Sequence, residues 1–299
     1  RDSIMPHSQH NLAALRGSIP PLVTPFKNGA VDYDRYAALV EFQIREGSHG
    51  ILVNGTTAEP STLTTEERNR LVTLAVRTAA GRIHVCAATG SQSLAESRAL
   101  TEHALAQGVD SLLIVTPYYI RPPQRGLIAY YLALAAGHDV PWMVYHIPGR
   151  TAVGVTLDTL KSLKDQSPSF VGIKHAVNDL GFVTHMLDKF GFDFRVFVGL
   201  EDLSFPMLCV GACGLMNAVG NALLADKPDA RILGHHQQIA AQGDVAAPGH
   251  RMAMHFGNGG LGAVDDALHE TLGMRVHAAH VIPAGLRAIA VLRHLDVAP

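Results

Sequence analysis

One lysine of this chain lies in an apolar setting that is unusual for a charged side chain. The segment Phe170–Ala176 has the short, continuous apolar pattern of a buried strand, and Lys174 interrupts it. The other five lysines lie in polar or turn-like surroundings. Burial lowers the pKa of an amine, and a neutral amine is a nucleophile that forms a Schiff base with a carbonyl compound. The alternative is an edge-strand lysine whose head group reaches water.

Hydroxyl, phenol and guanidinium side chains follow other strand-like runs. Thr56 and Thr57 end one run, Tyr119 follows another, Tyr145 ends a third, and Arg150 comes shortly after it. In a barrel of parallel strands these positions converge on one end. There the lysine would attack a keto acid, a phenol would move protons, and hydroxyls with backbone N–H groups would hold a carboxylate. Taken singly, each residue also has a structural interpretation as a cap, a packing aromatic or a surface charge.

The elements that must position these residues alternate between strand and helix. Strands are expected at Gly17–Pro25, His49–Gly55, Arg82–Thr89, Ser111–Pro117, Pro141–Ile147, Phe170–Ala176, Phe194–Leu200 and Cys213–Val219. Helices are expected at Tyr33–Glu46, Thr65–Ala80, Leu94–Gln107, Gln124–Gly137, Leu157–Lys164, Leu180–Phe190 and Glu201–Val210.

This alternation predicts an α/β protein with parallel strands and crossover helices, most simply a (β/α)8 TIM barrel. The competing architecture is a doubly wound open sheet. It loses support because no Gly-x-Gly-x-x-Gly motif follows the first strand.

Three regions are expected along the chain. Residues 1–16 are polar and irregular and are interpreted as a loose N-terminal arm, and residues 17–225 form the barrel. Residues 226–299 depart from the alternation and are interpreted as a C-terminal helical extension packed on the barrel. Its expected helices are Asp229–Gln242, Val264–Leu272 and Pro283–Leu295.

Composition excludes several classes of function. The 299 residues carry a net charge of −2 with no basic run, so nucleic acid is not expected as a partner. No signal-peptide pattern or membrane-length apolar run is found, which predicts a cytoplasmic protein without membrane contact. Three cysteines make no disulfide framework, and seventeen scattered histidines contain no His-Glu-x-x-His motif. We predict neither a metal site nor a cofactor, and the low charge of 17% favours surface buried between subunits.

Five stretches together identify a resemblance. The chain resembles the dihydrodipicolinate synthase / N-acetylneuraminate lyase family of class I aldolases and lyases over about residues 17–225. The stretches follow in family order: Gly17–Phe26 (GSIPPLVTPF), Gly55–Leu63 (GTTAEPSTL), Thr116–Pro122 (TPYYIRP), Tyr145–Thr151 (YHIPGRT) and Val171–Ala176 (VGIKHA).

The resemblance implies roles for the residues that bind the first substrate. Lys174 matches the lysine that forms the Schiff base with pyruvate, and Tyr145 matches the phenol that carries protons to and from it. Thr56 and Thr57 match the pair that binds the keto-acid carboxylate and joins the proton relay.

Further matches concern the second substrate and the assembly. Arg150 matches an arginine that holds the carboxylate of an aldehyde acid, and Gly199 and Met216 match backbone positions that line the pyruvate site. Tyr119 matches a tyrosine that, in the synthases, reaches into a neighbouring subunit's site. The resemblance thus implies a homo-oligomer, either a tetramer or a dimer.

Several departures leave the second substrate open. Ala58 and Pro60 replace a glycine and a serine, His175 stands where the synthases often have glutamate, and Leu200 lies in a loop that is more polar in the synthases. Parts of the chain look closer to a branch of 2,4-dihydroxyhept-2-ene-1,7-dioate aldolases. The hypotheses are therefore a dihydrodipicolinate synthase-like condensation, another hydroxy-keto-acid aldolase or dehydratase, and a non-catalytic keto-acid-binding barrel. Binding alone does not require a buried lysine.

Overall fold

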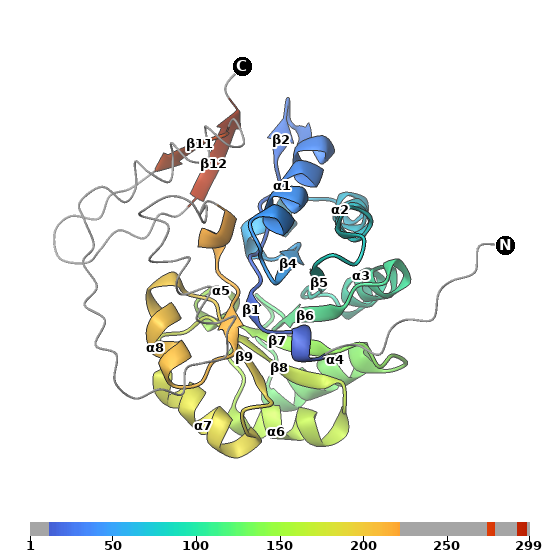
Figure 1. Cartoon of the computed structure of the whole chain (residues 1–299). Helices are drawn as coiled ribbons and strands as arrows, with labels where there is room; N and C mark the ends of the chain where they lie inside the picture. The colour runs from blue at the N-terminus through green and yellow to red at the C-terminus, as the bar shows by residue number, and fades with distance from the viewer. Residues whose placement is uncertain (1–11, 222–273, 279–291, 298–299) are drawn as a thin grey trace.

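A computed structural model describes residues 12–221, 274–278 and 292–297 and contains an eight-stranded parallel sheet (Figure 1). Along the sheet the strand order is β1-β10-β9-β8-β7-β6-β5-β4. The bounds are β1 Gly17–Ser18, β4 Gly50–Val53, β5 His84–Ala88, β6 Ser111–Val115, β7 Trp142–His146, β8 Phe170–His175, β9 Arg195–Val198 and β10 Gly214–Leu215.

The two outer strands of this order meet and close the sheet into a barrel. Pro21 and Leu52 form a parallel bridge, with Leu52 N donating to Pro20 O at 3.0 Å and Leu22 N to Leu52 O at 3.0 Å. The barrel prediction is confirmed and the open sheet is excluded. β1 is shorter than the expected Gly17–Pro25, because the prolines in that stretch have no N–H for a strand ladder.

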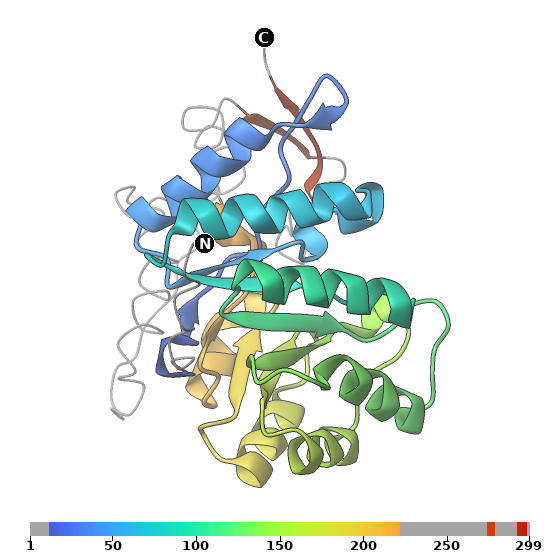
Figure 2. The same ribbon diagram turned by 90° about the vertical axis from the view of Figure 1, so that its right-hand side faces the viewer.

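Helices surround the strands, and most of them begin where the sequence predicts. Figures 1 and 2 show the first helices, coloured blue to green, following one another around the outside of the barrel. Thr64 and Glu67 form a reciprocal capping box, which fixes the start of the second helix. The helices are α1 Tyr33–Arg45, α2 Thr65–Ala79, α3 Leu94–Gln107, α4 Gln124–Ala135, α5 Pro148–Thr151, α6 Leu157–Gln166, α7 Leu180–Phe190 and α8 Ser204–Cys209.

Some short elements differ from the prediction. The helix expected at Glu201–Val210 is divided into a 3-10 turn, Glu201–Leu203, and α8, since Leu203 leaves helical geometry. A hairpin of β2 (Phe26–Lys27) and β3 (Ala30–Val31) was not predicted, although its turn residues are Asn28 and Gly29. Both have positive φ, 53° and 79°, and Asn-Gly is a strong hairpin signal.

The apolar core has two parts, one inside the barrel and one between strands and helices. Leu15, from the expected loose arm, is only 1% exposed and belongs to the inner part. A 3-10 turn at Leu12–Ala14 precedes it, and Leu12 O accepts a hydrogen bond from Arg195 Nη2 at 3.2 Å. The arm prediction is therefore wrong from Leu12 onward, because this segment buries an apolar side chain inside the barrel.

A β-bulge decides which face of β8 each residue takes. Trp142 pairs with Phe170, but the next residue of β7 pairs with Gly172, so Val171 is an extra residue. Val171 lies in the inner core and Ile173 in the outer core, although strict alternation would put both on one face. The bulge thereby turns Lys174 toward the barrel interior.

Little of the expected C-terminal helical extension falls within the described residues. Two segments there, β11 (Met274–Ala278) and β12 (Leu292–Val297), form an antiparallel pair. The helix expected at Pro283–Leu295 is wrong over 292–295, where the backbone pairs with another strand. The other two expected helices lie outside the described residues. Among the residues that are described, no helix is long and apolar enough to cross a membrane.

Candidate active site

Lys174 and Tyr145 are neighbours on adjacent strands inside the barrel. Their Cα atoms are register partners of β8 and β7, and the two residues are 3% and 5% exposed. Lys174 Nζ lies 4.4 Å from the centroid of the Tyr145 ring. A ring face attracts an ammonium group, so this contact holds the amine beside the phenol in an otherwise apolar interior. The structure brings together the two residues on which the predicted chemistry depends.

The threonine turn after β4 supplies a third polar group. Thr56 Oγ1 donates a hydrogen bond to Tyr145 OH at 3.4 Å, and Thr57 is half-buried in the same 3-10 turn, Thr56–Ala58. Thr24 Oγ1 donates to Ala58 O at 2.8 Å, which fixes the end of the turn. The Tyr145 phenol therefore contacts the Thr56 hydroxyl, from the turn after β4, and the Lys174 amine, from β8.

Left-handed backbone on each side gives this turn its shape. Asn54 has φ 58° and Glu59 has φ 54°. This left-handed region is unfavourable for any residue that carries a Cβ. Asn54 is buried, and its Nδ2 donates to Arg68 O at 2.9 Å. An asparagine side chain bonded to the backbone makes the conformation tolerable.

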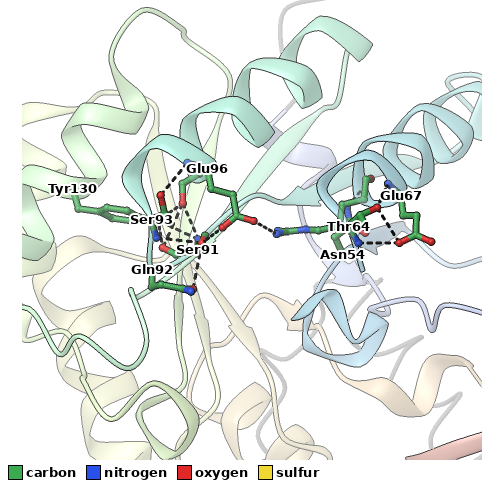
Figure 3. A network of polar contacts seen from close by, with 10 residues as sticks. Asn54, Thr64, Glu67, Ser91, Gln92, Ser93, Glu96 and Tyr130 are labelled. Carbon is green, nitrogen blue, oxygen red and sulfur yellow. Dashed lines mark hydrogen bonds and ion pairs between the residues drawn. The ribbon is translucent and has the colours of Figure 1, made fainter. Parts of the chain in front are cut away.

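A buried polar network supports the loops after β4 and β5 (Figure 3). Arg68 Nη1 pairs with Glu96 Oε1 at 3.4 Å, and the other Glu96 oxygen accepts from Ser91 Oγ. Tyr130 OH donates to Ser91 O at 2.8 Å. Burial lowers the pKa of Arg68, and the neighbouring Glu96 opposes that shift. The network ties the start of α2 and α3, and the middle of α4, to the strand ends beside the threonine turn.

β9 and β10, on the other side of β8 from β7, form a further wall of the site. A Cβ built on Gly199 would lie 3.1 Å from Lys174 Cε and 2.8 Å from Ala176 Cβ, so the lysine stem runs against bare backbone. Met216 is fully buried in the inner core, and its N–H donates to Val198 O at 2.8 Å. Both predicted positions therefore line the same interior as Lys174.

Arg150 lies outside this interior. It is exposed on α5, directly after β7, and no described contact joins it to Lys174 or Tyr145. Its helix is anchored, because Thr116 Oγ1 donates to Thr151 Oγ1 at 3.0 Å and Thr151 Oγ1 donates to Val153 O at 2.8 Å. Arg150 therefore lies on an anchored, exposed turn directly after β7.

Tyr119 is not brought to the lysine within this chain. It is 90% exposed with φ 70°, and the following Ile120 is 58% exposed. Positive φ is strained for an aromatic residue. The prediction that Tyr119 is catalytic therefore has no support from contacts inside one chain.

Sequence reasoning missed residues whose side chains pack around the lysine. Phe197 is the register partner of Lys174 on β9, and the alternating pattern of that strand was a usable signal. Burial raises the pKa of the Cys86 thiol, another inner-core residue, to about 12, and Lys174 opposes the shift. Burial therefore disfavours the thiolate, which is the reactive form of Cys86. Within the described residues, no group of three or more His, Cys, Asp or Glu could hold a metal ion.

An eight-stranded parallel barrel with a buried lysine beside a phenol at its strand ends defines a class I, Schiff-base-forming lyase. A profile described as "Dihydrodipicolinate synthetase family" matches residues 14–229, and the chain belongs to that family. It is a class I aldolase similar to 4-hydroxy-tetrahydrodipicolinate synthases.

Named relatives and solved structures agree with this assignment. A 4-hydroxy-tetrahydrodipicolinate synthase of Thermus thermophilus is 42% identical over 219 residues, covering 71% of this chain and 73% of the relative. Dihydrodipicolinate synthase from Aquifex aeolicus has a crystal structure with TM-score 0.71 and 33% identity, covering 86% of this chain and 81% of that one. The Acinetobacter baumannii enzyme, solved in complex with pyruvate, has TM-score 0.69 and 29% identity, covering 86% and 98%.

Proposed function

We propose that Lys174 condenses with pyruvate and that the resulting enamine adds to a short aldehyde that carries a carboxylate. The observation that carries this proposal is the buried Lys174 amine 4.4 Å from the centre of the Tyr145 ring. The amine adds to the pyruvate carbonyl, and loss of water gives the imine. Loss of a methyl proton then gives an enamine, whose carbon attacks the aldehyde, and hydrolysis releases the product from Lys174. A lyase runs the same steps in reverse.

We assign the proton transfers to Tyr145. Its hydroxyl receives a hydrogen bond from Thr56, which provides a relay between the interior and the strand ends. The hydroxyls of Thr56 and Thr57, with the backbone N–H groups of their turn, are proposed to bind the pyruvate carboxylate. Gly199 contributes by leaving room for the lysine stem and the substrate.

Two aldehydes fit the second position. The similarity to 4-hydroxy-tetrahydrodipicolinate synthases favours aspartate semialdehyde, whose α-amino group needs an acceptor near the site. Glu201 is close in sequence to Gly199, and its Oε1 accepts from Ala218 N at 2.8 Å, so its carboxylate is fixed. Leu200, where the synthases are more polar, favours an aldehyde without an amino group, such as succinic semialdehyde. That alternative corresponds to a 2,4-dihydroxyhept-2-ene-1,7-dioate aldolase.

We also propose a homo-oligomer with Tyr119 at a subunit interface. Tyr119 and Ile120 are 90% and 58% exposed, and covering their apolar surface with a second chain would lower the free energy. One structural neighbour, 26% identical with TM-score 0.70, is described as a monomeric dihydrodipicolinate synthase variant. Association therefore has to be measured for this chain.

Borohydride reduction in the presence of pyruvate is expected to leave a covalent adduct on Lys174. The Lys174→Arg variant should form none, since a guanidinium stays protonated, whereas Lys161→Arg should behave as wild type. Peptide mass spectrometry reads the result. An adduct on a different lysine would refute the mechanism. The absence of any adduct would favour the alternative of a non-catalytic keto-acid-binding barrel.

Tyr145→Phe is expected to slow turnover about 10²- to 10⁴-fold, the usual contribution of a positioned general acid–base group. Steady-state kinetics with pyruvate and a semialdehyde measure the loss. Tyr131→Phe is the matched control, because that buried hydroxyl bonds to Ile114 O in the outer core. Equal rates in Tyr145→Phe and wild type would show that the Tyr145 hydroxyl has no catalytic role and that the ring only packs.

Sedimentation velocity is expected to show a dimer or tetramer for the wild-type chain, weakened by Tyr119→Ala. Phe192→Ala is the control, because Phe192 is a similarly exposed aromatic, at 74%. A fully active wild-type monomer would contradict the proposed interface.

Arg150→Ala is expected to lower kcat/KM for a carboxylated aldehyde roughly tenfold to a hundredfold, the effect of losing a charge-assisted hydrogen bond. Pyruvate trapping should be largely unaffected, and Arg125→Ala, which removes another exposed arginine, serves as control. Comparing aspartate semialdehyde, succinic semialdehyde and an uncharged aldehyde identifies the substrate. If wild type and Arg150→Ala both use the uncharged aldehyde as well as the carboxylated ones, Arg150 does not select the substrate.

A further inference from the structure

Two histidines lie directly behind the reactive pair. His146 follows Tyr145 on β7, His175 follows Lys174 on β8, and the two histidines are themselves register partners. Because side chains alternate along a strand, both point out of the barrel, into the layer under the helices. They are 6% and 0% exposed. The proposed chemistry uses neither of them.

The two rings are joined by one hydrogen bond. His146 Nδ1 and His175 Nδ1 are 3.2 Å apart, with ring centroids 5.2 Å apart. One neutral ring donates its Nδ1–H and the other accepts with a bare Nδ1. Two protonated rings would direct two hydrogens at each other, so the bond requires at least one neutral ring.

The surroundings hold the pair in place and disfavour its protonation. Phe182 of α7 lies against both rings, stacked on His175 at 5.4 Å and tilted to His146 at 5.6 Å. Asp179, at the start of α7, is the one charged group described as acting on the pair. Burial lowers the pKa of each histidine to about 4, and Asp179 opposes the shift. On the other side, a Cβ on Gly154 would come within 2.8 Å of His146 Nε2.

The pair lies at the end of the ladder between β7 and β8. The bulge at Val171 interrupts the regular pairing three residues before Lys174, and the strands separate into loops soon after His175. Beyond the register pair, Ala176 N donates to His146 O at 3.0 Å. A side-chain bond at this step therefore opposes sliding of one strand along the other.

We propose that His146 and His175 are positioning residues: their hydrogen bond fixes β7 against β8 and so holds the phenol of Tyr145 beside the amine of Lys174. The inference rests on the proposed Schiff-base function. A displacement of about 1 Å at a reacting group can cost on the order of a hundredfold in rate. A hydrogen bond between the residues immediately after Tyr145 and Lys174 limits how far these two residues can move relative to each other.

The test is the double variant His146→Leu/His175→Leu, which removes both partners and keeps apolar bulk. Removing both partners of a buried hydrogen bond changes stability little, so the thermal midpoint at pH 7 should stay near that of wild type. Single-turnover trapping of pyruvate by borohydride should nevertheless slow roughly tenfold to a hundredfold. His185→Leu, on the exposed side of α7, is the matched control and should trap at the wild-type rate.

A conservative variant separates positioning from packing. Asparagine places an amide atom about where Nδ1 of histidine lies, so His175→Asn keeps a donor and an acceptor. It should recover most of the trapping rate that His175→Leu loses. Equal rates in His175→Asn and His175→Leu would show that the hydrogen bond has no part in the effect.

Acid sensitivity gives an independent readout. With folded-state pKa values of about 4, the pair stays neutral in the folded chain while free histidines in the unfolded chain take up protons below about pH 6.5. Stability therefore falls as pH drops from 6.5 to 4, and the double variant should lose less of its thermal midpoint over that window. An equal loss would show that the pair is not held neutral.

The outcomes separate the two proposals. Wild type that traps no pyruvate overturns the Schiff-base function and the positioning role together. Wild type that traps pyruvate, with a double variant that traps it equally fast, overturns the positioning role alone.

Discussion

The structure depends on keeping an amine inside a closed apolar barrel. Lys174 shares that interior with Phe197, Met216 and the buried thiol of Cys86, and no described acid lies in the inner core to pair with it. A charged group without a partner is costly in such a place. The face of the Tyr145 ring is the one contact described there that favours a cation. The rest of the site follows from that arrangement, because the phenol must sit on the neighbouring strand at the same height.

The supporting structure around this pair is polar but lies outside the inner core. The ion pair of Arg68 with Glu96 and the bonds of Asn54 and Tyr130 brace the loops after β4 and β5. These hydrogen bonds hold the loops in place, and a fixed loop keeps the Thr56 hydroxyl within reach of Tyr145. The barrel thus separates an apolar reactive interior from a hydrogen-bonded frame.

Most of the fold, and the core of the site, was predictable from the sequence. Helix starts were readable because caps such as Asp32 and Thr64 are local signals. The position of Lys174 was readable because a lysine in an apolar run is rare. The hairpin at Asn28 was missed although its turn carries a known signature.

Other features had no signal in a single sequence. The pairing of His146 with His175 depends on the register of two strands separated by two helices, α5 and α6. The specific roles of Tyr119 and Arg150 were taken from the resemblance, and the structure of one chain leaves both residues exposed. The C-terminal prediction used helical periodicity, whereas Leu292–Val297 satisfies its backbone by pairing with Met274–Ala278. Periodicity is a weak guide where pairing partners are far apart in sequence.

The bulge at Val171 determines which residues of β8 face the barrel interior and which face the helices. The same residues paired in strict alternation from Phe170 would turn Ile173 and His175 inward and Lys174 outward. The bulged register requires glycine at position 172, since a Cβ there would lie 2.0 Å from Arg195 O. The register of β8 therefore decides whether the barrel interior holds an amine or an imidazole.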